Sequence, residues 1–203
     1  MKKSQNRKPL RVIIILLFSC SFIGLQSQVT TSEAPHTPAV FIGVGGGLNE
    51  MGILGLAMEL PVGGKNSFGA SAGIGSWGYK LRGSLNFYTK EAGYKSCFSL
   101  GVSYATGMDN FTSELPVEPD DEMVELEMDL LPVLSIDLVY SYNIRVGKSS
   151  KVVLSLGYSI NTKSNAYTLH DSYYQLSDTG KQAMNLAQPG GLLLGLKFMF
   201  GVG

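Results

Sequence analysis

Period-two alternation of large apolar side chains with small or polar ones is the feature that most constrains how this chain can fold. It recurs in eight segments of the chain: 40–45, 54–60, 68–75, 79–87, 98–105, 134–143, 152–160 and 191–200. Successive side chains of a β-strand point to opposite faces of its sheet, so each segment predicts a strand with two different faces. Beyond residue 39, no segment of the sequence shows a long helical period.

The residues between the large apolar ones are small for a soluble β-protein. The exposed face of a soluble sheet usually carries many lysines and glutamates, whereas this face is mostly Gly, Ser and Ala. The chain has 25 glycines, and only 16% of its residues are charged. Small side chains suit the lumen of a narrow barrel, and a continuous aliphatic outer band suits lipid. The sequence therefore predicts an all-β fold, a closed antiparallel up-and-down transmembrane β-barrel of about eight strands. The alternative is ten strands, if the second long connection contains two more.

The lengths of the connections are sorted by side. If the first strand starts on the periplasmic side, the periplasmic connections are 61–66, 89–95 and 146–150, which are all short. The two long connections, 107–123 and 162–189, both fall on the outer side. Short periplasmic turns and long outer loops are typical of bacterial outer-membrane barrels. We therefore expect two long outer loops.

Aromatic residues on the apolar faces gather at the two ends of the predicted strands. The outer ends carry Tyr79, Tyr104 and Tyr158, and the periplasmic ends carry Phe87, Phe98, Tyr140, Tyr142, Phe198 and Phe200. The middles of the strands are aliphatic. Two aromatic girdles around an apolar band are typical of a protein that crosses both membrane interfaces.

The N-terminal region has the anatomy of a secretory signal peptide, with a basic stretch at 1–11 before an apolar run at 12–25. That run is about fourteen residues long, short of the roughly twenty that a membrane-spanning helix needs. We expect a signal peptide over 1–27, a flexible periplasmic lead-in over 28–38 and an outer-membrane β-barrel domain over 39–203. The motif Leu17-Phe18-Ser19-Cys20 leaves open a lipidated Cys20 as an alternative. The expected location is the outer membrane of a Gram-negative bacterium.

The last predicted strand, 191–200, has a Gly followed by alternating apolar residues that end in Phe200. This pattern resembles the final-strand signal by which outer-membrane barrels are recognised for insertion. It departs from that signal by carrying Gly201-Val202-Gly203 after Phe200 and by lacking a polar residue before Gly195. Together with the strand count, residues 39–200 resemble the OmpA/OmpX-type family of small eight-stranded outer-membrane barrels. The resemblance implies the fold and the insertion route, and it implies no single function.

Five charged residues fall on the faces that point into the predicted lumen: Glu59, Lys80, Arg82, Asp137 and Lys197. Strand direction puts Glu59, Asp137 and Lys197 in the periplasmic half and the other two nearer the outer mouth. Buried charges need partners, so the favoured interpretation is a structural network of mutually neutralising charges. The alternative is a polar path through a narrow transporter or pore for small solutes.

Three further acidic residues, Glu125, Glu127 and Asp129, alternate with apolar residues just before the sixth predicted strand. They have the same parity as the inward face of that strand. We therefore expect the strand to project beyond the membrane and to turn an acidic ladder toward the mouth.

The favoured function is a structural or surface-recognition role carried by the outer loops, because function in such folds tends to lie on loops held by a rigid scaffold. Tyr167, Tyr173 and Tyr174 in the second loop are aromatic residues of the kind that anchor interfaces. A lipid-modifying enzyme is the third hypothesis, since His170-Asp171-Ser172 contains the residue types of a hydrolase triad. Neighbours in an extended chain face opposite ways, so these three residues are not expected to converge, and we predict no catalytic residue. We also predict no metal site and no cofactor.

The expected partners are outer-membrane lipid, the barrel-insertion machinery and a ligand outside the cell. Lysine plus arginine equals aspartate plus glutamate, at 16 each. The formal charge of zero gives no overall basic field to attract nucleic acid, so nucleic acid is not expected as a partner.

Overall fold

The computed structural model describes residues 38–90 and 92–203. The predicted signal peptide over 1–27, and with it the alternative of a lipidated Cys20, lies outside these residues. The predicted lead-in over 28–38 also lies outside them, except for Pro38.

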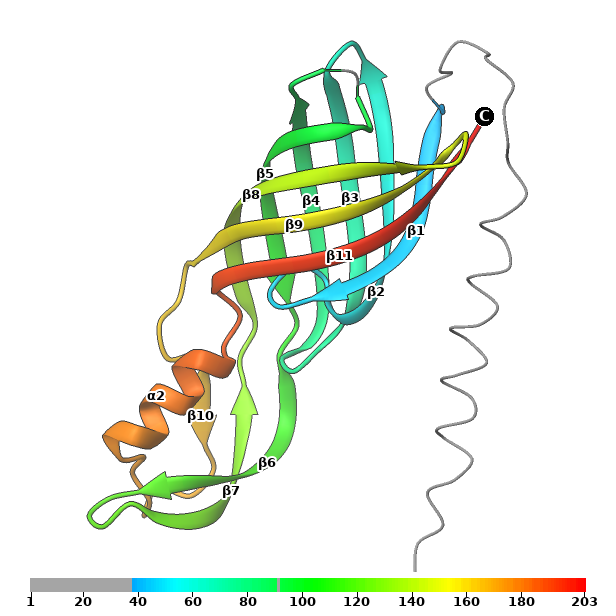
Figure 1. Ribbon diagram of the computed structural model, residues 1–203. Coiled ribbons are helices and arrows are strands. Elements are labelled where there is room, and N and C mark those ends of the chain that lie inside the picture. The colour runs from blue at the N-terminus through cyan, green and yellow to red at the C-terminus, as the bar shows by residue number, and fades with distance from the viewer. Residues whose placement is uncertain (1–37, 91) are drawn as a thin grey trace, which may run out of the picture. The chain divides into compact units, whose positions relative to one another are not determined.

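Eight strands close into an antiparallel barrel, which confirms the all-β fold and the count of eight. They are β1 (Val40–Gly47), β2 (Gly52–Gly63), β3 (Asn66–Gly75), β4 (Gly78–Tyr88), β5 (Lys95–Ala105), β8 (Val133–Val146), β9 (Ser150–Asn161) and β11 (Gly191–Val202). Around the barrel their order is β1-β11-β9-β8-β5-β4-β3-β2. Each barrel strand therefore pairs with the barrel strands that come before and after it in the sequence, and the first strand pairs with the last. The first and last strands pair from Val40 opposite Val202 to Gly46 opposite Leu196, which closes the barrel (Figure 1).

The barrel is apolar outside and polar inside. Large apolar side chains on the outer wall are exposed on every barrel strand, for example Ile42, Leu56, Phe68, Leu81, Leu100, Leu138, Leu156 and Leu196. Alternate residues on the same strands are buried in the lumen and are mainly small, polar or charged. This polarity is the reverse of that of a soluble protein, in which the interior is apolar.

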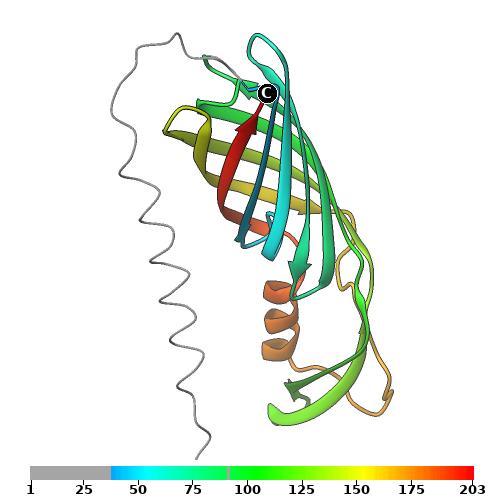
Figure 2. The same ribbon diagram turned by 90° about the vertical axis from the view of Figure 1, so that its right-hand side faces the viewer.

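The sequence predicted two long loops, but these two connections instead fold into an additional layer that we call the extension. It consists of β6 (Met108–Val117), β7 (Glu122–Leu130), β10 (Tyr167–Leu169) and α2 (Asp178–Ala187). The three strands form a separate sheet in the order β10-β7-β6, so the extra strands do not enter the barrel. Both views show the extension beyond one end of the barrel, which we call the mouth end (Figure 1, Figure 2).

The extension has an apolar core that continues into the mouth end of the barrel. Its buried residues are Trp77, Ala105, Leu115, Val117, Leu126, Met128, Leu130, Val133, Ala166, Leu176 and Met184. Trp77, Ala105 and Val133 come from the barrel wall or from its β3–β4 turn, so the two layers share one core.

Helix α2 was not predicted from the sequence, which shows no long helical period beyond residue 39. It begins after Ser177, whose hydroxyl accepts a hydrogen bond from the Gly180 N–H at 3.3 Å, as an N-cap does. Met184 is its main apolar contact with the extension core. No helix in the part of the chain that the structure describes is long and apolar enough to cross a membrane.

The prediction that an acidic ladder on β7 turns toward the mouth of the barrel is wrong. Glu125, Glu127 and Asp129 lie toward solvent on β7, and the residues between them, Leu126 and Met128, are buried in the extension core. Even-numbered residues face the core in β7, whereas odd-numbered residues face the lumen in β8. The chain leaves its strand conformation at Leu131 and Pro132, and this break changes which parity points inward.

We predict that Met128→Ala destabilises the extension by about 2–5 kcal/mol, because Met128 is fully buried and truncation leaves a cavity. Limited proteolysis of the folded protein should then cut within β6, β7 and α2 faster than in the wild type, while the barrel strands stay protected. Met123→Ala is the matched control, since Met123 is exposed on the same strand. Equal protection of the two variants would contradict a packed extension core.

Candidate functional site

The lumen contains two groups of ionised side chains. The first, which we call the Glu59 cluster, consists of Glu59, Lys151, Tyr88 and Ser67. The Lys151 Nζ donates to Glu59 Oε2 at 2.6 Å, and both side chains are buried. The other carboxylate oxygen, Oε1, accepts from the Tyr88 hydroxyl at 2.5 Å and from the Ser67 hydroxyl at 2.7 Å. Both oxygens of Glu59 are thus hydrogen-bonded, as a buried carboxylate requires.

The Glu59 cluster is packed as well as paired. The Lys151 ammonium lies 4.2 Å from the centre of the Phe41 ring, a distance typical of a cation–π contact. Phe41 is fully buried with Met51 and Met199 in an apolar layer inside the barrel. Lys151 therefore has a carboxylate on one side and an aromatic face on the other, and both hold it out of water.

The second group, which we call the mouth cluster, consists of Glu50, Lys80, Arg82, Asp137 and Lys197. The Arg82 Nε donates to Asp137 Oδ2 at 2.9 Å across the lumen. The other oxygen, Oδ1, accepts from the hydroxyls of Ser159 at 2.6 Å and Ser103 at 3.2 Å. Asp137 is thus fully paired by three strands of the wall.

The β1–β2 connection at 48–51 folds into the mouth of the barrel, and we call it the inward turn. Glu50 is fully buried, and its Oε1 accepts from the Lys197 Nζ at 2.6 Å. The Lys80 Nζ donates to the backbone carbonyl of Asn49 at 2.6 Å. Two lysines from opposite parts of the wall therefore hold the same turn.

Strand β11 holds the inward turn from the other side. The Asn49 amide donates to the carbonyls of Gly190 and Leu192, the latter at 3.0 Å. The Leu48 carbonyl accepts from the Leu194 N–H at 2.9 Å. These bonds fix the turn across the opening, so that it closes the mouth end of the lumen.

Glycines make room for the inward turn. A side chain at Gly195 would collide with the Glu50 carboxylate, which occupies that space on the lumen side of β11. Gly52, where β2 begins, has a φ of +90°, and a Cβ there would collide with the Ile74 carbonyl. Both positions require glycine for a steric reason.

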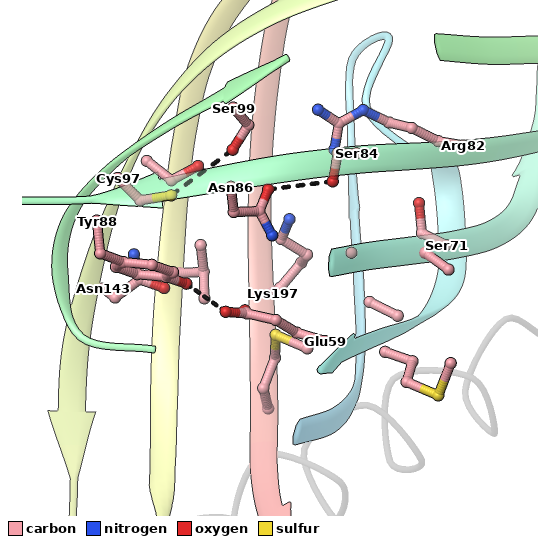
Figure 3. A pocket seen from close by; sticks show the side chains of 17 residues that line it. Glu59, Ser71, Arg82, Ser84, Asn86, Tyr88, Cys97, Ser99, Asn143 and Lys197 are labelled. Carbon is pink, nitrogen blue, oxygen red and sulfur yellow. Dashed lines mark hydrogen bonds between the residues drawn. The ribbon is translucent and has the colours of Figure 1, made fainter. Parts of the chain in front are cut away.

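A cavity of about 40 Å³ lies inside the barrel, lined by members of both clusters (Figure 3). Glu59, Arg82 and Lys197 reach it, together with the polar side chains of Ser84 and Asn86. Arg82 lines this cavity, and its Nη2 atom has no hydrogen-bond partner among the residues that the structure describes. A space of that size has room for a few water molecules and for no larger solute.

All five predicted lumen charges lie inside the barrel, but only Arg82 and Asp137 pair with each other. Glu59 pairs with Lys151, and Lys197 pairs with Glu50. Neither Lys151 nor Glu50 was predicted to point into the lumen. The predicted division into halves is wrong for Asp137, which lies nearer the mouth end of β8 and pairs with Arg82. The ammonium group of Lys197 extends to Glu50 in the inward turn.

The two missed residues left different signals in the sequence. Lys151 has the parity of Val153 and Ser155, so continuing the alternation by two residues toward the turn would have placed it in the lumen. Glu50 lies in a turn, where alternation does not apply, and the sequence offers only the small residue at Gly195 opposite it.

Of the three predicted recognition tyrosines, only Tyr173 is available to a partner. Tyr167 and Tyr174 are half-buried and pack against the extension core. Tyr173 is 85% exposed, and its ring meets that of Tyr174 edge-on at 5.4 Å. The exposed ring is therefore held by a half-buried neighbour.

The segment His170-Asp171-Ser172 is not arranged as a hydrolase triad. His170 Nε2 lies 2.9 Å from Asp129 Oδ1, and Asp171 accepts the backbone N–H of Tyr173 at 2.9 Å. Among residues 38–90 and 92–203, no hydrogen bond joins Ser172 to His170. The backbone N–H of Asn110 and then the His170 side chain hold the pKa of the Asp129 carboxyl below its usual range. These groups tie β10 to β7.

No protein-family model matches this chain, and no curated protein or solved structure matches it either. A function for this protein is therefore inferred from its own residues.

We predict that Lys151→Met destabilises the barrel by about 3 kcal/mol, because it leaves the buried Glu59 carboxylate without its cation. The measurement is the temperature at which the folded band disappears on a mild detergent gel. Lys65→Met, at an exposed turn position, is the matched control and should leave that temperature unchanged.

Adding Glu59→Gln to Lys151→Met should restore part of the loss, because the uncompensated charge is removed. Equal and negligible effects of Lys151→Met and Lys65→Met would contradict a dry, paired Glu59 cluster.

Proposed function

We propose that this protein is an integral barrel of a bacterial outer membrane that displays a folded recognition module, the extension, on the outer side. The observation that carries the proposal is the inverted polarity of the barrel. A continuous belt of exposed aliphatic side chains surrounds it, while paired charges fill its interior. Water would disfavour such a belt, whereas the hydrocarbon core of a bilayer favours it.

The aromatic side chains on the outer wall support the same proposal. Tyr79, Tyr104 and Tyr158 are exposed on the wall near the mouth end, and Phe87, Phe98, Tyr142 and Phe200 are exposed near the opposite end. The residues between the two rings are mainly aliphatic. Aromatic rings with one wet edge are favoured at the two interfaces of a bilayer.

The extension suits recognition better than a mobile loop would. Its sheet and helix share a core with the barrel, so its surface is held rigidly before any partner binds. A preorganised surface loses less conformational entropy on binding than a flexible one. Tyr173 projects from this rigid layer and offers an aromatic side chain of the kind that anchors interfaces.

The geometry of the lumen argues against a pore. The inward turn crosses the mouth, the Glu59 cluster fills the section beyond it, and the cavity between them holds only a few waters. An eight-stranded barrel is just wide enough for its own side chains. The transport alternative therefore has no open path in this conformation.

The first prediction of this proposal is that the mature protein fractionates with the outer membrane. It should also migrate faster unheated than boiled on a mild detergent gel, because a closed barrel resists unfolding by detergent. Recovery of the protein as a soluble monomer without detergent would reject the membrane assignment.

The second prediction concerns the side on which the extension lies. A Tyr173→Cys variant should react with a membrane-impermeant maleimide on intact cells, because residue 173 is highly exposed. Lys65→Cys, in the β2–β3 turn at the other end of the barrel, should react only after lysis. The native Cys97 is buried and should give no signal. The opposite labelling pattern would show that the extension faces the periplasm.

A further inference from the structure

A groove of about 560 Å³ opens at the mouth end and reaches Lys80, and we call it the mouth groove. It lies between the C-terminal end of α2 and the β1–β2 and β3–β4 turns. The residues that line it include Leu48, Ile53, Trp77, Lys80, Leu186 and Pro189. Its volume is within the range of roughly 300–1,000 Å³ that is typical of small-molecule sites.

The walls of the mouth groove are apolar and uncovered. Ile53 is 77% exposed and Leu186 is 84% exposed, and Leu48 is also exposed. Leu186 lies on the surface of α2, on the extension, so the membrane belt of the barrel wall does not account for it. These side chains form a surface that an aliphatic chain would cover favourably.

Lys80 contributes a buried cation to the same groove. Its side chain is nine-tenths buried, and within the described part of the chain its one hydrogen bond is to the neutral carbonyl of Asn49. An ammonium group has three donors. No carboxylate of the described residues lies within 4 Å of it. The nearby carboxylates form their ion pairs with other cations, Asp137 Oδ2 with Arg82 and Glu50 Oε1 with Lys197.

The numbers of positive and negative side chains inside the barrel also indicate that Lys80 favours an added negative charge. Among residues 38–90 and 92–203, the buried or nearly buried carboxylates are those of Glu50, Glu59 and Asp137, whereas the cations are Lys80, Arg82, Lys151 and Lys197. Three anions against four cations leave one positive charge in excess within this set. A buried charge is stable only when it is paired, so this site favours a single negative charge from outside the chain.

We propose that the mouth groove binds a single-chain lipid carboxylate, with its headgroup at Lys80 and its hydrocarbon chain along Leu48, Ile53 and Leu186. A monoanion matches the one unpaired cation. A phosphate would match less well, because the guanidinium that could bind it bidentately is already held by Asp137. The inference goes beyond the proposed display function, which requires no small ligand.

Trp77 makes the proposal measurable, because it is the one tryptophan of the chain and it lines the mouth groove. Its indole N–H donates to the Leu131 carbonyl at 2.9 Å, which fixes the ring beside the site. Dibrominated stearate, added to the folded protein in neutral detergent micelles, should quench Trp77 fluorescence in a saturable way. The methyl ester of the same acid should bind about tenfold more weakly, since it lacks the charge-assisted contact.

Two variants distinguish binding of the ligand in the mouth groove from its partition into the detergent micelle. Lys80→Met should abolish the difference between acid and ester. Leu186→Glu places a negative charge at an exposed position on the rim and should weaken the acid about tenfold more than the ester. Met123→Glu is its matched control, exposed on the extension but outside the groove, and should bind as the wild type does. If Lys80→Met does not fold, Leu186→Glu against Met123→Glu still decides the question.

Equal, unsaturable quenching by acid and ester in every variant would show partition into the micelle only and would overturn the proposal. Tighter competition by octadecyl phosphate than by stearate would overturn the carboxylate assignment. Migration of the same samples on the detergent gel reports separately on the folded barrel. Loss of specific quenching with an intact barrel would therefore reject the ligand and leave the membrane assignment standing.

Discussion

The antiparallel pairing of β1 with β11 is the interaction on which the rest of the structure depends. It leaves the barrel without an edge, so every barrel residue points either to the outer wall or to a narrow interior. Charged side chains that point inward must then find partners across the lumen. Glu59 on β2 reaches Lys151 on β9, and Arg82 on β4 reaches Asp137 on β8, and neither pair joins adjacent strands. The ion pairs thus brace a cylinder whose wall is already complete in its backbone hydrogen bonds.

Alternation predicted the barrel well because period two is a local property that survives in each strand separately. The extension was missed because its strands obey the same alternation with the opposite parity inward, and only the break at Leu131 and Pro132 separates β7 from β8. Helix α2 was missed because its short buried side consists mainly of Gly180 and Met184. Its ten residues are too few to show a long helical period, and packing against the extension supplies the stability that so short a helix lacks by itself.

The candidate site was predictable in its faces but not in its partners. Parity identifies which residues point inward, as it did for Arg82 and Asp137, but it does not give the rotation of one strand against another across a barrel. Ion pairs between distant strands depend on that rotation. Glu50 lay beyond any such rule, because a turn that folds back into a lumen depends on tertiary contacts with β11 and on the empty space at Gly195.

The inward turn has a consequence for the order in which the molecule is assembled. The turn belongs to the first hairpin of the barrel, yet most of its bonds are to Gly190, Leu192, Leu194 and Lys197, on or beside the last strand. Those groups are not beside it until β11 has paired with β1. Without that pairing, the Glu50 carboxylate lacks the ion pair with Lys197 that it has in the closed barrel. The inward turn therefore has its full set of bonds only in a barrel whose first and last strands are paired in the register from Val40 opposite Val202 to Gly46 opposite Leu196.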